Sequence, residues 1–464
     1  MKKIIMLVGL LVFLFSPLSV LASVDKSEKL RAFLDEAVDQ YSIPGASLAI
    51  IENGEIIFEN NWGALSDGST ITGDTPFLIG SISKPITALA TMMLVEEGKI
   101  DLEEPIETYL PSFTYKSESP ITVRHLLNQT SGISAADGFE ITDRASADWT
   151  ISEAINQLSG VELVSEPGEV YKYNSANYTL LGGIIEAVSN ETFSKYIQDH
   201  IFSPLQMDDA AADYERAVQK GLVPGYASWW GNPLKSDSLY DHAGAPYGYM
   251  SASTNDLVNF LQFMMDGGDL LSEESLALLT THPGEVGKYG LGWHFSKTEH
   301  FPFHGGSTPH FRGELFFLPE QGIGAVLLTN KHHIMEDGNV YYIMDGIRSI
   351  LNGEEPNLPA PSYLVQWVLL GILLVILLFT ISHIIKLFRT KNPNKKLAYT
   401  VGSISIVLAA VLIPLFGLFI GTPWRTIKLF APDIAFLTHC VVGVLGVYGV
   451  AAVILISVKS RKQV

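Results

Sequence analysis

The chain has 464 residues, of which 47% are apolar and 17% charged, and its mean hydropathy of +0.24 is high for a wholly soluble protein. Its formal charge of −19 is unevenly distributed, because 48 of the 49 Asp and Glu residues precede residue 363. An acidic body repels phosphate backbones, which excludes nucleic acid as a partner. The single cysteine, Cys440, excludes an intrachain disulfide and a cysteine-rich metal site.

The first 22 residues have the three parts of a secretory signal peptide. Lys2 and Lys3 form a basic start, residues 4–15 are apolar, and residues 20–22 offer a cleavage site. An uncleaved membrane anchor is the alternative. In either case, we expect the acidic body to be exported.

The body, residues 23–353, is predicted to be one α+β domain with an antiparallel sheet. After a first amphipathic helix, two β-type runs flank Asn53-Gly54, which is a strong hairpin signal. A second β pair is predicted over residues 313–318 and 323–329. Helical patterns fill the chain between the two pairs, over residues 84–97, 123–127, 179–188, 193–202 and 255–265. We therefore expect a sheet built from both chain ends with an inserted helical section, rather than a doubly wound parallel sheet.

Ser81 and Lys84 lie at the start of the first inserted helix, where residues three apart share a face. A serine hydroxyl is a poor nucleophile unless a base takes its proton. A lysine can act as that base if burial lowers its pKa. Ser-x-x-Lys is common by chance, however, and an ordinary helix start with Ser83 as its cap is the alternative.

Two further segments carry polar residues in a suggestive order. Residues 171–178 contain Tyr173 and Ser175 and precede an apolar helix; an ordinary helix start with core tyrosines is the alternative. Residues 303–307 precede the last β pair, and a glycine-containing turn is the alternative there.

The C-terminal quarter of the chain is predicted to be membrane-embedded. A proline-rich linker over residues 354–363 leads into three apolar runs, each longer than the ~20 residues that cross a bilayer as a helix. These runs, together residues 364–458, cover 364–385, 397–420 and 434–458. Five cations lie between the first two runs, so the positive-inside rule places that connection and residues 459–464 in the cytoplasm and the body outside. Buried helices of a larger soluble core are the alternative.

Taken in order, the three motifs Ser81-x-x-Lys84, Tyr173-x-Ser175 and His304-x-Gly306 resemble those of the penicillin-recognising serine hydrolases. The resemblance is closer to the class C β-lactamase-like branch, which often has His-x-Gly as its third motif. It extends over about residues 27–350 and implies a β-lactamase/transpeptidase-like fold and hydrolysis through an acyl-enzyme.

The resemblance also implies a role for each motif residue. Ser81 is expected to be the acylated nucleophile, and Lys84 to assist its deprotonation. Tyr173 is expected to act as a general base, as a tyrosinate near Lys84, with the division of proton transfer between the two left open.

The third motif is expected to bind substrate. Backbone N–H groups of Ser81 and Ser307 are expected to form the oxyanion hole. The strand edge beside the substrate is expected to consist of His304, Gly305 and Gly306.

Ser175 departs from the family pattern, which has Asn at this substrate-contacting position. A Tyr-x-Ser motif and three C-terminal membrane helices resemble the membrane-bound peptidases of the colibactin-maturation type, which remove an acylated D-asparagine cap from a prodrug. His242 falls in the region where those peptidases carry a substrate-contacting histidine; an ordinary loop histidine is the alternative.

The resulting hypothesis is a serine peptidase of the bacterial cell membrane that acts on D-amino-acid-containing acyl peptides and contacts membrane lipid. The alternatives are a D-Ala-D-Ala carboxypeptidase acting on cell-wall peptides, a β-lactamase, an esterase, and a β-lactam sensor without turnover. No cofactor is implied. No metal site is expected, because no carboxylate or thiol accompanies His300, His304 and His310 at zinc spacing. His332 and His333, at the end of a strand, are expected to be exposed.

Overall fold

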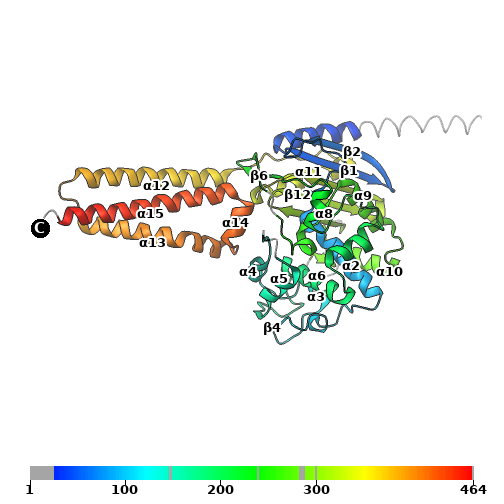
Figure 1. Ribbon diagram of the computed structural model, residues 1–464. Helices are drawn as coiled ribbons and strands as arrows, with labels where there is room; N and C mark the ends of the chain where they lie inside the picture. Colours follow the sequence, from blue (N-terminus) through cyan, green and yellow to red (C-terminus); the bar gives the residue numbers. More distant parts are fainter. Residues whose placement is uncertain are drawn as a thin grey trace, which may run out of the picture.

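The computed structural model describes residues 26–461, apart from residues 145, 147–148, 238–239, 282–287 and 298–299. Figure 1 shows a rounded body of sheet and helices, and a bundle of three long helices that leaves the body at one end. The predicted signal peptide and residues 462–464 lie outside the described residues.

A seven-stranded antiparallel sheet with the order β2-β1-β13-β12-β11-β10-β9 forms the centre of the body. Its strands come from both ends of the domain, which confirms the predicted sheet. The strands are β1 (Gly45–Glu52), β2 (Glu55–Gly63), β9 (Tyr289–Gly290), β10 (Trp293–Phe295), β11 (Pro302–Thr308), β12 (Phe311–Leu318) and β13 (Ile323–Thr329). Shorter strands outside this sheet are β3 (Phe77–Leu78), β4 (Tyr115–Lys116), β5 (Val161–Glu162), β6 (Tyr226–Trp229), β7 (Asn232–Lys235), β8 (Ser251–Ala252) and β14 (Lys331–His332).

The turn between β1 and β2 has the predicted hairpin geometry. Asn53 and Gly54 have φ angles of 51° and 80°, both in the left-handed region that a two-residue type I′ turn requires. Glu52 consequently pairs with Glu55 across the turn.

Both faces of the sheet are covered by helices, and β1 shows how. Ala49 and Ile51 pack with the inserted helical section, whereas Leu48 and Ile50 pack with the helix over residues 26–40 and with α11 (Gly338–Leu351) on the other face. Alternate residues of a strand point to opposite faces, so a strand buried on both sides has an apolar residue at nearly every position.

The inserted section is mostly helical, as predicted. Its central helix is α2 (Ser83–Glu96), in which every residue from Ser83 to Leu94 is buried. The other helices are α3 (Val123–Leu127), α4 (Ala135–Ile141), α5 (Ile151–Leu158), α6 (Ser175–Ser189), α7 (Phe193–Ile197), α8 (Tyr214–Gln219), α9 (Thr254–Asp266) and α10 (Glu273–Thr280). The start of α2 thus lies where the helical section meets the sheet.

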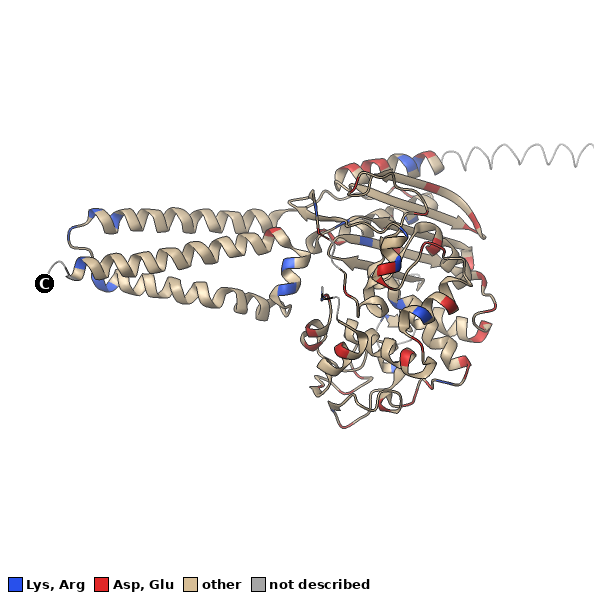
Figure 2. Cartoon of the chain, viewed as in Figure 1, with Lys and Arg blue, Asp and Glu red and all other residues tan. Residues whose placement is uncertain are grey.

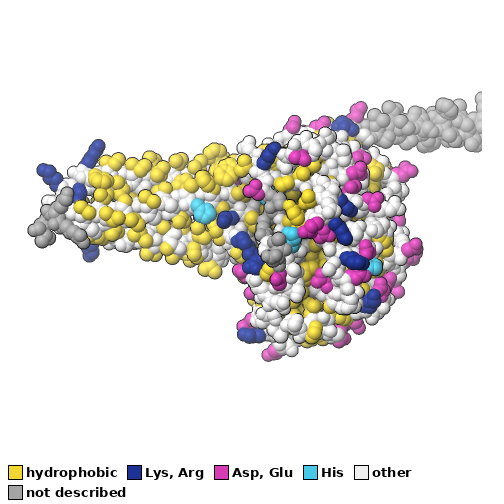
Figure 3. Space-filling model, viewed as in Figure 1, with side chains coloured by type: hydrophobic (Ala, Val, Ile, Leu, Met, Phe, Trp, Pro, Cys, Tyr) yellow, Lys and Arg dark blue, Asp and Glu magenta, His cyan; other side chains and the backbone are white. Residues whose placement is uncertain are grey.

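Three helices of the C-terminal region are long and apolar enough to cross a membrane: α12 (Leu364–Arg389), α13 (Lys395–Ile420) and α15 (Pro432–Arg461). Hydrophobic side chains cover the face of the bundle seen in Figure 3, and Figure 2 shows Lys and Arg only near its two ends. Backbones approach closely where Gly402 faces Gly449, as small residues allow in membrane helices.

The predicted linker lies against the body rather than standing free of it. The Tyr41 hydroxyl and the Gln40 amide both donate to the carbonyl of Pro359, at 2.8 and 3.0 Å. A short helix, α14 (Trp424–Phe430), connects α13 to α15 at the end of the bundle next to the body (Figure 1).

Candidate active site

Ser81 and Lys84 meet at the start of α2. A short 3-10 turn over Gly80–Ile82 leads into the helix, and Lys84 Nζ donates to Ser81 Oγ at 2.9 Å. Lys84 is fully buried, whereas Ser81 is partly exposed. The sequence spacing therefore produces a serine that solvent reaches and a lysine that it does not.

The buried Lys84 ammonium has polar partners but no carboxylate in direct contact among the described residues. It donates to the carbonyl of Tyr247 at 2.7 Å and to Ser175 Oγ at 3.3 Å. Burial lowers the pKa of Lys84 to about 7, although the nearby charge of Asp143 acts in the opposite direction. A large fraction of Lys84 is therefore neutral near pH 7 and able to accept a proton.

Tyr173 completes the cluster around Ser81. Its side chain lies beside Ser81, and its ring packs on His294 at 5.7 Å and on Tyr289 at 5.8 Å. Burial raises the pKa of Tyr173 well above its ordinary value, and the opposing effects of Ser81 and of the Arg312 charge are smaller. A raised pKa favours a protonated phenol over the expected tyrosinate.

The turn that carries Tyr173 and Ser175 is fixed by Gln129. The Gln129 side-chain oxygen accepts from the Asn174 backbone N–H at 2.9 Å and from the Asn177 amide at 2.6 Å. Asn174 in turn caps α6 by accepting from the N–H of Ala176. Sequence reasoning gave Gln129 no role, although its segment contributed to the family resemblance.

Strand β11 lies against the turn before α2. A Cβ on Gly306 would lie 1.9 Å from the Ile79 carbonyl oxygen and 3.0 Å from the Ser81 nitrogen. A Cβ on Gly80, whose φ is +56°, would lie 2.3 Å from the Ser307 nitrogen. Two glycines therefore permit the close approach that brings the N–H groups of Ser81 and Ser307 together, as an oxyanion hole requires.

Ser307 is oriented by an ion pair that the sequence did not reveal. Its hydroxyl donates to Asp337 at 2.8 Å, and Asp337 pairs with the Arg312 guanidinium at 2.8 Å. Burial alone would raise the pKa of Asp337, but Arg312 and a hydrogen bond from His332 hold it below its usual range. The carboxylate thus stays charged and keeps the Ser307 hydroxyl turned toward it.

His304 points into the protein. It is 1% exposed, and its ring packs against His294 at 4.9 Å and Tyr289 at 5.8 Å. Burial lowers the pKa of His294 to about 4, with Lys84 contributing, and burial also lowers the pKa of His304 well below its ordinary value. Both imidazoles are therefore neutral at pH 7 and add no charge beside Lys84.

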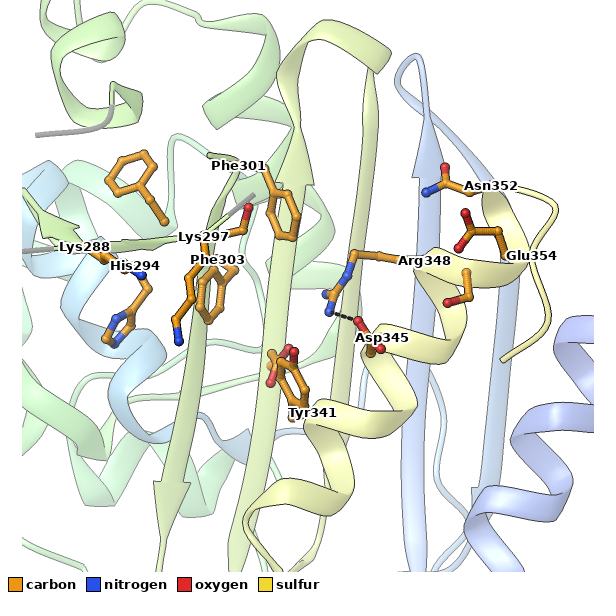
Figure 4. Close-up of a pocket in the computed structure, with 14 residues that line it drawn as sticks. Lys288, His294, Lys297, Phe301, Phe303, Tyr341, Asp345, Arg348, Asn352 and Glu354 are labelled. Carbon is orange, nitrogen blue, oxygen red and sulfur yellow. Dashed lines mark hydrogen bonds and ion pairs between the residues drawn. The ribbon is translucent and has the colours of Figure 1, made fainter. Parts of the chain in front are cut away.

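A cavity of about 700 Å³ borders this cluster through His294, which lines it and also stacks on Tyr173. Figure 4 shows its aromatic walls, formed by Phe301, Phe303 and Tyr341, together with the Arg348–Asp345 ion pair. Ser81, Lys84 and Tyr173 are not among the residues that line it.

His242 is not brought into the cluster. Its ring packs against Tyr240 at 5.4 Å and Tyr214 at 5.6 Å, and no contact among the described residues joins it to Ser81. The neighbouring Asp241 accepts from the Tyr247 hydroxyl at 2.6 Å, so this turn presents Asp241, not His242, to the residue that contacts Lys84. Among the described residues, no group of three or more His, Cys, Asp and Glu side chains could hold a metal ion.

Comparison with known proteins agrees with this geometry. Protein flp of Staphylococcus aureus (strain MW2) is 29% identical over 318 residues, which cover 66% of this chain and 63% of flp. The putative penicillin-binding protein PbpX of Bacillus subtilis (strain 168) is 33% identical over 279 residues, 59% of this chain and 66% of PbpX. The chain thus spans less than two thirds of the length of these two relatives.

A solved structure shares the fold over the body. The D-amino acid amidase from Ochrobactrum anthropi SV3, complexed with D-phenylalanine, superposes with a TM-score of 0.58 at 25% identity, covering 71% of this chain and 100% of the amidase. A family model described as Beta-lactamase matches residues 30–343, from the first helix to α11. The chain therefore belongs to the β-lactamase family of serine hydrolases.

Proposed function

We propose that this protein is an exported, membrane-anchored serine hydrolase that cleaves an amide bond of a D-amino-acid-containing acyl peptide through an acyl-enzyme. One observation carries the proposal: the buried Lys84 amine, with a pKa of about 7, lies 2.9 Å from Ser81 Oγ. A β-lactam sensor without turnover would not need a base such as Lys84 to release the acyl group, so the presence of this base favours an enzyme.

Acylation follows from this arrangement. Ser81 Oγ attacks the carbonyl carbon and its proton passes to neutral Lys84, while the oxyanion accepts hydrogen bonds from the N–H groups of Ser81 and Ser307. When the carbon–nitrogen bond breaks, the Tyr173 phenol gives its proton to the leaving nitrogen and recovers one from the Lys84 ammonium. Water then attacks the ester with Lys84 as base, and Ser81 leaves with a proton, which restores the resting state.

The choice of substrate rests on Ser175. Its hydroxyl lies 3.3 Å from Lys84 Nζ, where the family pattern would provide the two donors and the acceptor of an amide. A site built to bind a particular polar group can reject analogues that lack it by about 10⁴–10⁵. We therefore favour an N-acyl-D-amino-acid cap of the prodrug type, with D-Asn preferred; the D-amino acid amidase that shares the fold supports a D-residue.

A D-Ala-D-Ala carboxypeptidase is the second candidate, favoured by the similarity to a putative penicillin-binding protein. The isolation of His242 from the cluster removes one of the two residues proposed to read a D-Asn side chain.

The function is tested by offering the full-length protein in detergent matched N-acyl-D-Asn and N-acyl-L-Asn amides, a D-Ala-D-Ala peptide and nitrocefin. We expect the D-Asn amide to be cleaved fastest, because the hydroxyl of Ser175 replaces the amide of the lactamase pattern. Ser81→Ala should abolish all turnover. Preference for the D-Ala-D-Ala peptide would establish the carboxypeptidase, and activity retained by Ser81→Ala would exclude the mechanism.

The pH dependence follows from Lys84. Because the base must be neutral, the rate of Ser81 labelling by a serine-reactive phosphonate should rise with pH and reach half its maximum near pH 7. Mass spectrometry of the adduct against time gives this rate. A half-maximum near pH 10, the ordinary range of a lysine, would contradict a desolvated base.

Gly306→Ala should lower acylation by about 10²-fold or more, because its Cβ would separate β11 from Ile79 and open the oxyanion hole. Gly248→Ala is the matched control: it adds the same methyl group near Gly80, but the closest atom lies 3.8 Å away. Equal labelling rates in the two variants would show that the close approach of β11 is not required.

We propose that the body lies outside the cell. Because α14 and the body share one end of the bundle, residues 386–396 and the end of α15 lie at the other. Most cations of the C-terminal region fall in residues 386–396 and 459–464 of the sequence (Figure 2). A membrane-impermeant thiol reagent added to whole cells should modify a cysteine placed at Lys428 but spare one placed at Lys391. The reverse pattern would invert the topology.

A further inference from the structure

The short helix α14, which joins two membrane-spanning helices, contacts the end of α4 in the body. Arg425 Nη2 donates to the carbonyl of Thr142 at 2.9 Å and also to the carbonyl of Phe139. Both carbonyls lie at the C-terminal end of α4, where helix carbonyls lack partners within the helix. Arg425 therefore caps α4 from the membrane region of the chain.

A short series of hydrogen bonds leads from this cap to Lys84. Asp143 follows Thr142 in a left-handed conformation with φ of 55°, and its N–H donates to the Tyr247 hydroxyl at 2.8 Å. Its carboxylate accepts from the Tyr249 hydroxyl at 2.8 Å. The carbonyl of Tyr247 accepts from Lys84 Nζ at 2.7 Å. Moving residues 142–143 would therefore displace a direct partner of the lysine.

Electrostatic interactions connect Arg425, Asp143 and Lys84 as well. Burial raises the pKa of Asp143, and the positive charges of Arg425 and Lys84 oppose that rise. Lys84 also faces the rings of Tyr173, Tyr178 and Tyr247, which are protonated because burial raises their pKa values. The nearby His294 and His304 are neutral, because burial lowers their pKa values. Asp143 is thus the charged group that acts on Lys84, and Arg425 favours its charged form.

The membrane region also contacts the residues beside Ser307. His333 pairs with Asp433, the first acid of α15, at 2.8 Å, and both side chains are fully buried. His332 packs on Phe430 of α14 and hydrogen-bonds Asp337, which orients Ser307. The expected exposure of His332 and His333 was therefore wrong, because α14 and the start of α15 cover them.

We propose that α14 is part of the active site and that Arg425 is a positioning residue for Lys84, acting through residues 142–143 and Tyr247. The inference rests on the proposed role of Lys84 as the base. It makes the membrane bundle a component of the hydrolytic machinery in addition to an anchor.

The test measures phosphonate labelling of Ser81 against pH in the full-length protein in detergent, for wild type, Arg425→Gln, Arg425→Lys and Lys428→Gln. Lys428 is exposed on the same helix and serves as the matched control. Arg425→Gln should slow labelling by tenfold or more, on the scale of about 10²-fold that misplacing a catalytic group costs. It should also move the half-maximum to lower pH, because a neutral Asp143 no longer supports the Lys84 ammonium.

Arg425→Lys, which keeps the charge, should restore the half-maximum toward that of wild type, and Lys428→Gln should match wild type throughout. Asp143→Asn, which removes the carboxylate without touching α14, should reproduce the acid shift. The inference would be overturned if the labelling rate of Arg425→Gln against pH superposed on that of wild type. It would also be overturned if labelling became slower while the pH of the half-maximum stayed the same, because that result indicates a purely structural contact. Absence of labelling in wild type would instead overturn the proposed function.

Discussion

The structure depends on one electrostatic constraint: the Lys84 amine is held out of water with no carboxylate in contact among the described residues. Desolvation penalises the charged form of a lysine, so the fold itself produces a base near neutral pH. The cost of burying the ammonium is limited because two hydroxyls and one carbonyl accept from it. The neutral histidines and protonated tyrosines around it preserve this state, since a carboxylate in contact would restore the ammonium.

The fold was largely predictable because its signals are local. Asn53-Gly54 specifies a type I′ turn from two residues. Strand β13 occupies the predicted residues 323–329, because a strand that is buried on both faces is apolar at nearly every position. Ser81, Lys84 and Tyr173 were identified through a family motif, and the structure places them together. The spacing of Ser81 and Lys84 alone favoured an ordinary helix start.

The remaining parts of the site depend on contacts between distant segments, which no local pattern encodes. Gln129, Asp143 and Tyr247 reach Lys84 or its neighbours across more than 40 positions of the sequence. Arg425 contacts Thr142, which lies 283 positions away in the sequence. The same holds for the ionisation of Tyr173, because its pKa depends on burial, which the motif does not contain.

The most direct test of the account is the titration of Lys84 itself. Full-length protein labelled with ¹³C at the lysine ε carbon would be followed by NMR against pH, and the Lys84 signal would be identified by its loss in Lys84→Met. The account predicts a midpoint near 7, well below those of the exposed lysines. A midpoint near the ordinary lysine value of about 10.4 would contradict it, since Ser81 would then have no neutral base beside it.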